Sequence, residues 1–568
     1  MKLNKHRRGF NAFKKIKEKA AKEWEKWSDS DSSFDASASD ASSDVVSDEY
    51  DISNSDADDK DKYEVFEEWL EDNGARFQDL EICEYDDPQA EKKGKDSNCR
   101  GVHARKSIPK ATVCATIPIE CLITAIMGKE ECPIGKKLRN SSVHISDSVY
   151  LAIYVLWDRK NPHSFHAPYY KVMPQNLDNF PIAWSEQELA KHLEGSTVLD
   201  IIAERKQSFS REYNEICAAL PEFPERCGSY DDFLWAIMQV TSRNFCLTID
   251  GSMTNVLIPY VDMLNHKLPE ETAWTFDSSR QAVTLTTLQK LPMGSQIFDS
   301  YGVKSNQRYF CNYGFSVETD NMDQNEVSIV LPKSGKHTLT VNTWSANSLF
   351  NKLRQESRSS SSKKKKGYDD AYYGSSQPES IASERKAVRF MMYTIAQRLN
   401  EFPTTLKQDR KDLKDLKKYP LYGNARNAKI QVKGEKEILY YYVSWARVAL
   451  ACLDAIQQED NAGYKELLKD MQLHELPNEV QVYCNDTLGA LRTTKKKKTP
   501  SSRPWESPHT DSTANSTNSF VSNSVYSDWD NESISSTYDD ESISMASSYR
   551  QPKRVERSTR KQRSSRRF

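Results

Sequence analysis

Three polar side chains that could bind a ligand or take part in a reaction lie near the middle of the chain. Asp262, Asn265 and His266 fall within and just after the apolar stretch 256–264. A carboxylate, an amide and an imidazole at the end of a strand form a common ligand-binding arrangement. The same residue types also terminate strands, and a lone histidine is more often packed in a core. Taken alone, this segment favours a structural role.

A second stretch, further along the chain, carries two tyrosine-glycine steps. Tyr301-Gly302 and Tyr313-Gly314 lie twelve residues apart, and Phe315 follows the second step. Glycine allows backbone conformations that other residues resist, and buried tyrosine hydroxyls need hydrogen-bond partners. The spacing suits a site lined by phenols, but aromatic packing explains it equally well.

Composition excludes several classes of protein. The chain has 568 residues and 19 glycines, of which no two lie closer than seven positions. Neither a dinucleotide-binding G-x-G-x-x-G motif nor a phosphate-binding loop of the Walker type can therefore occur. The eleven cysteines form no C-x-x-C pair, which predicts reduced thiols. With no apolar run long enough for a membrane span, we expect a soluble protein of the cytoplasm, the nucleus or both.

Local composition divides the chain into folded and disordered parts. The apolar share of 37% is below the ~45–50% typical of globular chains. We predict disorder in a basic and then acidic arm over 1–62, in a spacer over 355–383 and in a Ser/Thr-rich basic tail over 493–568. The basic termini could bind nucleic acid or an acidic partner, or could simply be solvated.

The folded remainder alternates between strand and helix patterns. Strand patterns at 100–127 and 254–302 flank a helical block at 147–240, and the chain after 384 is helical. This order predicts an α+β core followed by a mostly helical domain.

The order of these motifs resembles that of the SET-domain methyltransferases, in particular the branch similar to the Rubisco large-subunit lysine methyltransferase. The resemblance covers roughly residues 63–492. Four segments carry it: Asn98-Cys99-Arg100-Gly101-Val102-His103-Ala104, Ser242-Arg243-Asn244-Phe245, Asp262-Met263-Leu264-Asn265-His266, and Tyr301-Gly302 with Tyr313-Gly314-Phe315.

The resemblance implies a particular architecture. A pseudoknotted SET β core would occupy 63–324, with a helical insertion at about 130–240. A helical substrate-binding domain of the Rubisco methyltransferase type would occupy 325–492, interrupted by the disordered insertion 355–383.

The resemblance also implies an activity. It predicts an S-adenosylmethionine-dependent protein-lysine N-methyltransferase that acts on a non-histone protein, with no metal, and we expect a monomer. The catalytic phenol would be Tyr301. The remaining residues divide between cofactor binding, with Asn98, Arg100, Arg243, Asp262, Asn265, His266 and Phe315, and a substrate channel, with Phe245, Val261 and Tyr313.

Two alternatives remain beside lysine methylation. Family members that resemble the actin-histidine methyltransferase carry Trp just before the Asp and Asn two places after the Arg, where this chain has Val261 and Phe245. These apolar side chains favour an alkyl-ammonium acceptor over an imidazole. The alternatives are a protein-histidine N-methyltransferase of the actin-directed type and an inactive SET scaffold that binds partner proteins. The chain also has Asn98 where the family commonly has Glu.

Overall fold

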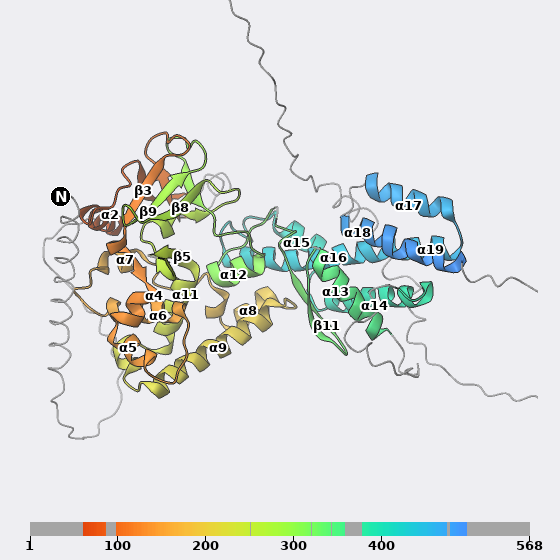
Figure 1. Cartoon of the computed structure of the whole chain (residues 1–568), viewed down its shortest axis with the longest axis horizontal. Helices are drawn as coiled ribbons and strands as arrows, with labels where there is room; N and C mark the ends of the chain where they lie inside the picture. Colours follow the sequence, from red (N-terminus) through yellow and green to blue (C-terminus); the bar gives the residue numbers. More distant parts are fainter. Residues whose placement is uncertain are drawn as a thin grey trace, which may run out of the picture.

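The computed structural model describes residues 61–86, 98–249, 251–319, 321–341, 343–357, 378–473 and 478–496 (Figure 1). The arms predicted over 1–62 and 493–568 lie almost entirely outside the described residues. Most of the predicted insertion at 355–383 does so too, but helix α13 extends to Glu356 and α14 begins at Ile381.

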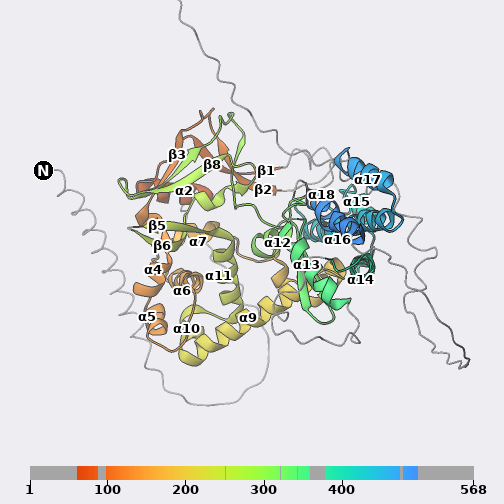
Figure 2. The ribbon, with the colours of Figure 1, turned by 45° about the vertical axis from the view of Figure 1, so that its right-hand side comes forward.

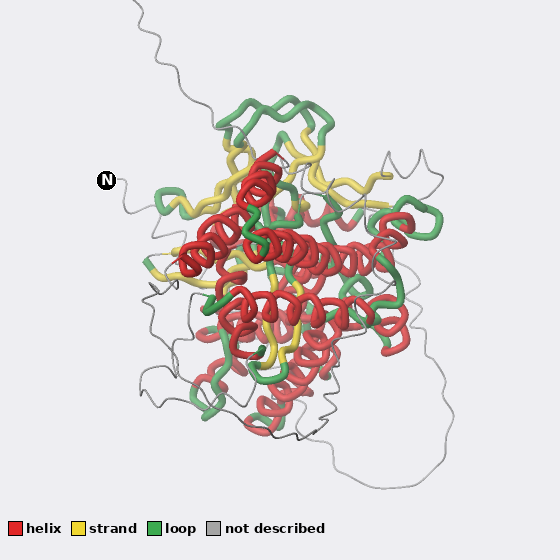
Figure 3. The backbone as a smooth tube through the Cα atoms, turned by 90° about the vertical axis from the view of Figure 1, so that its right-hand side faces the viewer, coloured by secondary structure: helices red, strands yellow, loops and turns green. Residues whose placement is uncertain are grey.

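The N-terminal half contains small sheets rather than one continuous sheet (Figure 3). A four-stranded sheet has the order β1-β2-β10-β7, and two three-stranded sheets have the orders β3-β9-β8 and β4-β6-β5. Their strands are β1 (Leu80–Asp86), β2 (Asn98–Ala104), β3 (Val113–Pro118), β4 (Ile123–Thr124), β5 (Asn244–Ile249), β6 (Ser252–Leu257), β7 (Asn265–His266), β8 (Thr272–Asp277), β9 (Ala282–Thr287) and β10 (Gln296–Asp299).

Helices fill the chain between β4 and β5. Local signals set several of their starts: Ser229 and Asp232 form a capping box at the first turn of α11, and Ser185 and Glu188 form another at α8. The helices of this half are α2 (Lys62–Asp72), α4 (Ala125–Glu130), α5 (Pro133–Arg139), α6 (Asp147–Arg159), α7 (Ala167–Val172), α8 (Glu186–Leu193), α9 (Val198–Ala219), α10 (Phe223–Cys227), α11 (Tyr230–Arg243) and α12 (Asn306–Tyr313).

The C-terminal half is mostly helical, as expected, but it opens with a hairpin that the helical interpretation missed. Strands β11 (Val327–Leu331) and β12 (Gly335–Leu339) pair antiparallel. Val327, Ile329 and Leu331 are buried at every second position, which is the period of a strand. The helices that follow are α13 (Thr343–Glu356), α14 (Ile381–Asn400), α15 (Leu406–Asp412), α16 (Asn424–Gln457), α17 (Asn461–Leu473), α18 (Asn478–Val482) and α19 (Gly489–Lys496).

The two halves share structural elements at their boundary. Helix α9 begins in the core of the C-terminal half, where Val198 and Ile202 are buried, and reaches the core of the N-terminal half at Ile216 (Figure 2). Just before it, Gly195 has φ +77°, and a Cβ there would lie 2.5 Å from the carbonyl oxygen of Glu401. Only glycine fits this close approach of two backbones.

The expected α+β class and the helical C-terminal region are thus confirmed, with the hairpin as the exception. Of the helices in the described part of the chain, none has both the length and the apolar character that a bilayer span requires.

Candidate active site

A parallel pairing of two short strands brings the two predicted motifs together. Phe298 and Asp299 of β10 pair with Asn265 and His266 of β7, while the start of β10 pairs antiparallel with β2. The chain therefore places the end of the Asp-x-x-Asn-His segment beside the start of the Tyr-Gly segment. The first motif, from Asn98 to Ala104, forms the neighbouring strand.

Tyr301 is held at both its backbone and its side chain. Its hydroxyl donates to the carbonyl oxygen of Leu264 at 2.8 Å, and its backbone N–H donates to Nδ1 of His266 at 3.0 Å. Burial raises the pKa of Tyr301 to about 12, although Arg243 and Arg100 lower it. The phenol is therefore neutral near pH 7 and acts as a hydrogen-bond donor.

Aromatic rings surround the Tyr301 ring. Tyr313 stacks on it with centroids 5.0 Å apart, and Phe315 lies edge-on at 6.1 Å. His266 stacks on it at 5.2 Å and contacts Phe315 at 5.9 Å. These four predicted site residues therefore form one cluster.

Tyr309 is a member of the same cluster to which the sequence interpretation assigned no role in the site. Its ring stacks on Phe315 at 5.2 Å, and its hydroxyl donates to the carbonyl oxygen of Gly302 at 2.6 Å. It lies four positions before Tyr313 on α12, so a helical pattern in this stretch would have placed both on one face. Gly314 ends the helix at φ +77° and turns the chain toward Phe315.

A buried ion pair lies close enough to Tyr301 to interact with it electrostatically. Nη1 of Arg243, in the last turn of α11, lies 3.1 Å from Oδ2 of Asp262, whose side chain is fully buried. The hydroxyl of Tyr169 donates to the same oxygen at 2.6 Å, and Oδ1 of Asp262 has no hydrogen-bond partner in the structure. Tyr169 lies on α7, far away in sequence, and was not among the predicted site residues.

Asn265 links the first motif to the site. Its side-chain amide donates to the carbonyl oxygen of Arg100 and to Oε1 of Gln296, both at 2.8 Å. Nη1 of Arg100 in turn contacts the sulfur of Met263. Gln296 thus joins the site from β10, where sequence reasoning had assigned it no role. Asn98 begins β2, and its side chain is outside the described structure.

The two predicted acceptor-side residues are apolar and packed. Val261 is buried at the start of the single turn Val261–Met263. The ring of Phe245, on β5, packs edge-on against Trp274 of β8 with centroids 5.1 Å apart. Trp274 thus extends the predicted channel wall beyond the residues named from sequence.

The charges of this region suit a carboxylate ligand. Arg100 and Arg243 interact electrostatically with each other and with the single carboxylate of Asp262. Burial and the charge of Arg243 lower the pKa of Arg100. Two guanidinium groups against one carboxylate leave a surplus positive charge, which the carboxylate of a methionine moiety would neutralise. The residues present therefore fit S-adenosylmethionine. Among the described residues, no cluster of three His, Cys, Asp or Glu side chains suits a metal ion.

His266 gives this site a predictable dependence on pH. Burial, followed by the nearby charge of Lys304, lowers the pKa of His266 to about 4, and its Nδ1 must be unprotonated to accept from Tyr301. Between pH 6.5 and 4 the unfolded chain therefore binds a proton that the folded chain rejects. We expect the melting temperature to fall with acidification over this interval, and to fall less in His266→Gln, whose side-chain oxygen can accept without titrating.

Thermal melts at several pH values between 4 and 7.5 test this. His163→Gln is the matched control, because His163 is exposed. An acid sensitivity that His266→Gln and His163→Gln reduce equally would contradict the assignment to His266.

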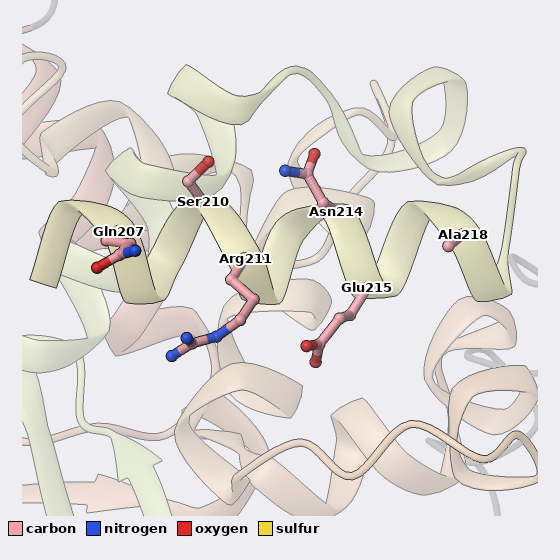
Figure 4. A pocket seen from close by; sticks show the side chains of 6 residues that line it. All are labelled: Gln207, Ser210, Arg211, Asn214, Glu215 and Ala218. Carbon is pink, nitrogen blue, oxygen red and sulfur yellow. The ribbon is translucent and has the colours of Figure 1, made fainter. Parts of the chain in front are cut away.

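A separate shallow depression of about 450 Å³ runs along the outer face of α9 (Figure 4). Side chains of a single helix line it, and none of the predicted site residues is among them: Gln207, Ser210, Arg211, Asn214, Glu215 and Ala218.

Comparisons with solved structures agree with this fold. The chain matches the crystal structure of the SET domain of LSMT bound to lysine and AdoHcy, at a TM-score of 0.53 and 18% identity. The match covers 74% of this chain and 95% of the solved one. Rubisco LSMT bound to AdoMet matches with a TM-score of 0.53 and 19% identity, over 74% of this chain and 96% of the other.

Sequence comparisons give a family domain and curated relatives. Residues 345–439 match the family "Rubisco LSMT substrate-binding". Actin-histidine N-methyltransferase of Xenopus tropicalis is 25% identical over 279 residues, which are 47% of this chain and 46% of the relative. The human enzyme is 23% identical over 278 residues, 47% of this chain and 44% of the relative. The chain spans about half the length of the curated relatives it matches.

The strand pairing and the solved structures define a protein with a SET-domain fold. More particularly, residues 345–439 match the Rubisco LSMT substrate-binding family and the fold matches that of LSMT, so the resemblance to that branch, inferred from the sequence, is confirmed.

Proposed function

We propose that this protein is an S-adenosylmethionine-dependent protein N-methyltransferase with a lysine side chain as its acceptor. The observation that carries the proposal is the pairing of β7 with β10, which seats the Tyr301 backbone on His266 beside the buried Arg243–Asp262 pair. The substrate-binding domain at 345–439 supports a protein substrate.

The cofactor, when bound, supplies a methyl group activated by a sulfonium. Arg100 and Arg243 would hold its carboxylate. The Tyr301 hydroxyl would then leave its bond to Leu264 to orient the acceptor amine, and the rings of Tyr301 and Tyr313 would exclude water. These groups act by alignment, because an in-line displacement needs the nucleophile and the methyl group on one axis.

A lysine acceptor must be neutral to attack, although its ordinary pKa is ~10.4. The site favours the neutral amine for two reasons. The rings around Tyr301 would desolvate the ammonium, and the positive charges of Arg100, Arg243 and Lys304 would oppose it. The proton would leave to solvent before the amine enters the channel.

The nature of the acceptor residue is the finer part of the proposal. The curated relatives support the alternative, histidine methylation, better than lysine methylation. The side chains of this chain favour lysine, because Val261 and Phe245 offer an imidazole no hydrogen-bond partner.

Mass spectrometry of methylated sites decides between the two. Cell lysate would be incubated with the purified protein and labelled S-adenosylmethionine, and the labelled sites mapped. We expect the label on lysine, and labelling only of histidine would establish the alternative. In the double variant Phe245→Asn with Val261→Trp, we expect the lysine product to fall at least about tenfold, since polar groups then line an apolar channel.

Cofactor binding separates an enzyme from an inactive scaffold. Asn265→Ala removes the amide that links β7 to Arg100 and Gln296. We expect its affinity for S-adenosylmethionine, measured by calorimetry, to fall by about tenfold or more. Asn255→Ala is the control, because Asn255 lies on β6, in another sheet, and its amide donates to Ser148 of α6. Absence of binding by the unaltered chain would favour the scaffold.

A further inference from the structure

In the segment that joins α14 to α16, two of the three carboxylates face α16, whereas the lysines are exposed. Residues 406–419 contain five lysines and one arginine against three aspartates. Asp409 is fully buried and receives Nζ of Lys436 at 2.5 Å and Nζ of Lys429 at 3.1 Å, both from α16. Asp412 lies 3.7 Å from Lys429. Two of the three carboxylates therefore neutralise the helix beneath, and not the lysines of their own segment.

The lysines of this segment point outward. Lys407, Lys411, Lys414 and Lys418 are exposed, and we call these four residues the basic rim. None of them pairs with a carboxylate within the part of the chain that the structure describes. The third aspartate, Asp415, accepts instead from the backbone N–H groups of Lys417 and Lys418. The result is a positively charged surface on a neutralised base.

The basic rim is tied to the segment that lines the candidate active site. Arg426 donates to the carbonyl oxygens of Leu413 and Tyr419, at 2.9 and 3.0 Å, and pairs with Glu318 at 2.5 Å. The side chain of Arg426 is only 6% exposed, so this link is rigid. Glu318 follows Phe315, whose ring contacts Tyr301.

Neighbouring residues make a second link. The side chain of Asn427 accepts from the backbone N–H of Ser316 at 3.2 Å and donates to the carbonyl oxygen of Gly314 at 3.3 Å. Helix α15 packs against α16, and α16 packs against α12, which carries Tyr309 and Tyr313 (Figure 1). The basic rim is therefore held in a fixed position relative to the Tyr301 cluster.

More positive charge lies beside Tyr301 and on the helix that follows it. Nζ of Lys304 contacts the carbonyl oxygen of Tyr301, and Arg308 is exposed on the next helix. The two cations repel each other. A substrate that passes Lys304 and Arg308 on its way to Tyr301 would meet this positive charge.

We propose that the basic rim binds acidic side chains that flank the methyl-acceptor residue of the protein substrate, an inference that rests on the proposed function. Charges of this kind raise the association rate and the affinity for a complementary substrate, with little effect on the chemical step. They act on substrate affinity and therefore on KM, and they weaken as salt increases. A polypeptide is favoured over RNA because the rim is fixed to the segment that would line the acceptor channel.

Peptide binding to the full chain tests the proposal. The probes are two fluorescent peptides with a central lysine, one flanked by glutamates and the other by glutamines in the same positions. We expect the glutamate peptide to bind about tenfold more tightly at low salt, and this preference to vanish near 0.5 M salt. In K407E/K411E/K414E/K418E the preference should be lost or reversed.

The matched control is K110E/K136E/K171E/K290E, which reverses four exposed lysines of the N-terminal half. It changes the net charge equally and should keep the preference. Equal binding of the two peptides, equal loss in both variants, or tighter binding of an oligoribonucleotide than of the glutamate peptide would overturn the proposal. Calorimetry with S-adenosylmethionine runs in parallel, and a failure there would contradict the proposed function while the peptide comparison still decides the role of the rim.

Discussion

In Tyr301→Phe, we expect kcat for methyl transfer to fall by about 100-fold to 1,000-fold, with binding of S-adenosylmethionine retained. The hydroxyl is a neutral donor near pH 7, because burial raises the pKa of Tyr301 to about 12. Removing a preorganised donor from a water-excluded site typically costs that much in rate. Quantitative transfer of label to lysate proteins measures the rate, and calorimetry measures cofactor binding.

Tyr309→Phe is the matched control. Tyr309 belongs to the same ring cluster, but its hydroxyl donates to the carbonyl oxygen of Gly302. Its loss should cost stability of about 1 kcal/mol and at most a few-fold in kcat. Equal loss of rate in both variants would indicate that the phenols act only through packing, and full activity of Tyr301→Phe would remove Tyr301 from the chemistry.

Folding of Tyr301→Phe is not expected to limit this experiment. The substitution keeps the ring that stacks on Tyr313 and His266, and it removes one hydrogen bond, to Leu264. A backbone carbonyl that loses its donor costs about 1–3 kcal/mol. A thermal melt therefore separates loss of rate from loss of structure.

The site residues that could be predicted from the sequence lie in short, contiguous motifs. His266 and Tyr301 each sit in a short, ordered signature, and the pairing of β7 with β10 brings them together. Tyr309 lies four positions before Tyr313, so predicting a helix over this stretch would have placed both rings on one face.

Tyr169 and Gln296 could not be identified in the same way. Tyr169 contacts the site through a side-chain hydrogen bond to Asp262, and Gln296 through one to Asn265, each from an element distant in sequence. The hydrophobic periodicity of a sequence does not predict such a contact, because the contact depends on how whole helices and strands pack.

Backbone strain is a further feature that sequence patterns do not carry. Tyr260 has φ +76°, a conformation that bulky residues rarely adopt, and it comes directly before the turn that presents Asp262. Its ring is buried and stacks on Phe77 with centroids 4.2 Å apart. Packing against Phe77, which precedes β1, thus holds Tyr260 in a backbone conformation that a bulky residue disfavours.

The β11–β12 hairpin was missed for a different reason. Its buried positions alternate, so the strand signal was present, but the interpretation of this region followed the helices after it. The residues that gather around Tyr301 come mostly from contiguous motifs, whereas the contacts between the two halves depend on packing that no single motif contains.

Arg243→Met should be the most destabilising single change at the site. Arg243 is the only side chain with an ion pair to Asp262 among the described residues, and the Asp262 side chain is fully buried. Removing the ion-pair partner of a buried carboxylate costs about 3–5 kcal/mol, because Arg100 and the Tyr169 hydroxyl then compensate the charge of Asp262 only in part. Denaturation in urea, followed by tryptophan fluorescence, measures the loss in free energy of unfolding, and calorimetry should show cofactor affinity falling as well.

Two further variants assign that loss to the charge of Asp262. Arg105→Met removes an exposed arginine that lies 3.5 Å from Glu81, and such surface pairs contribute at most about 1 kcal/mol. Combining Arg243→Met with Asp262→Asn should recover part of the stability, because the remaining amide is neutral, but it should not restore cofactor binding, because the Arg243 guanidinium that would pair with the cofactor carboxylate is gone. If the double variant is as unstable as Arg243→Met alone, the guanidinium acts through packing and the electrostatic account of the site is wrong.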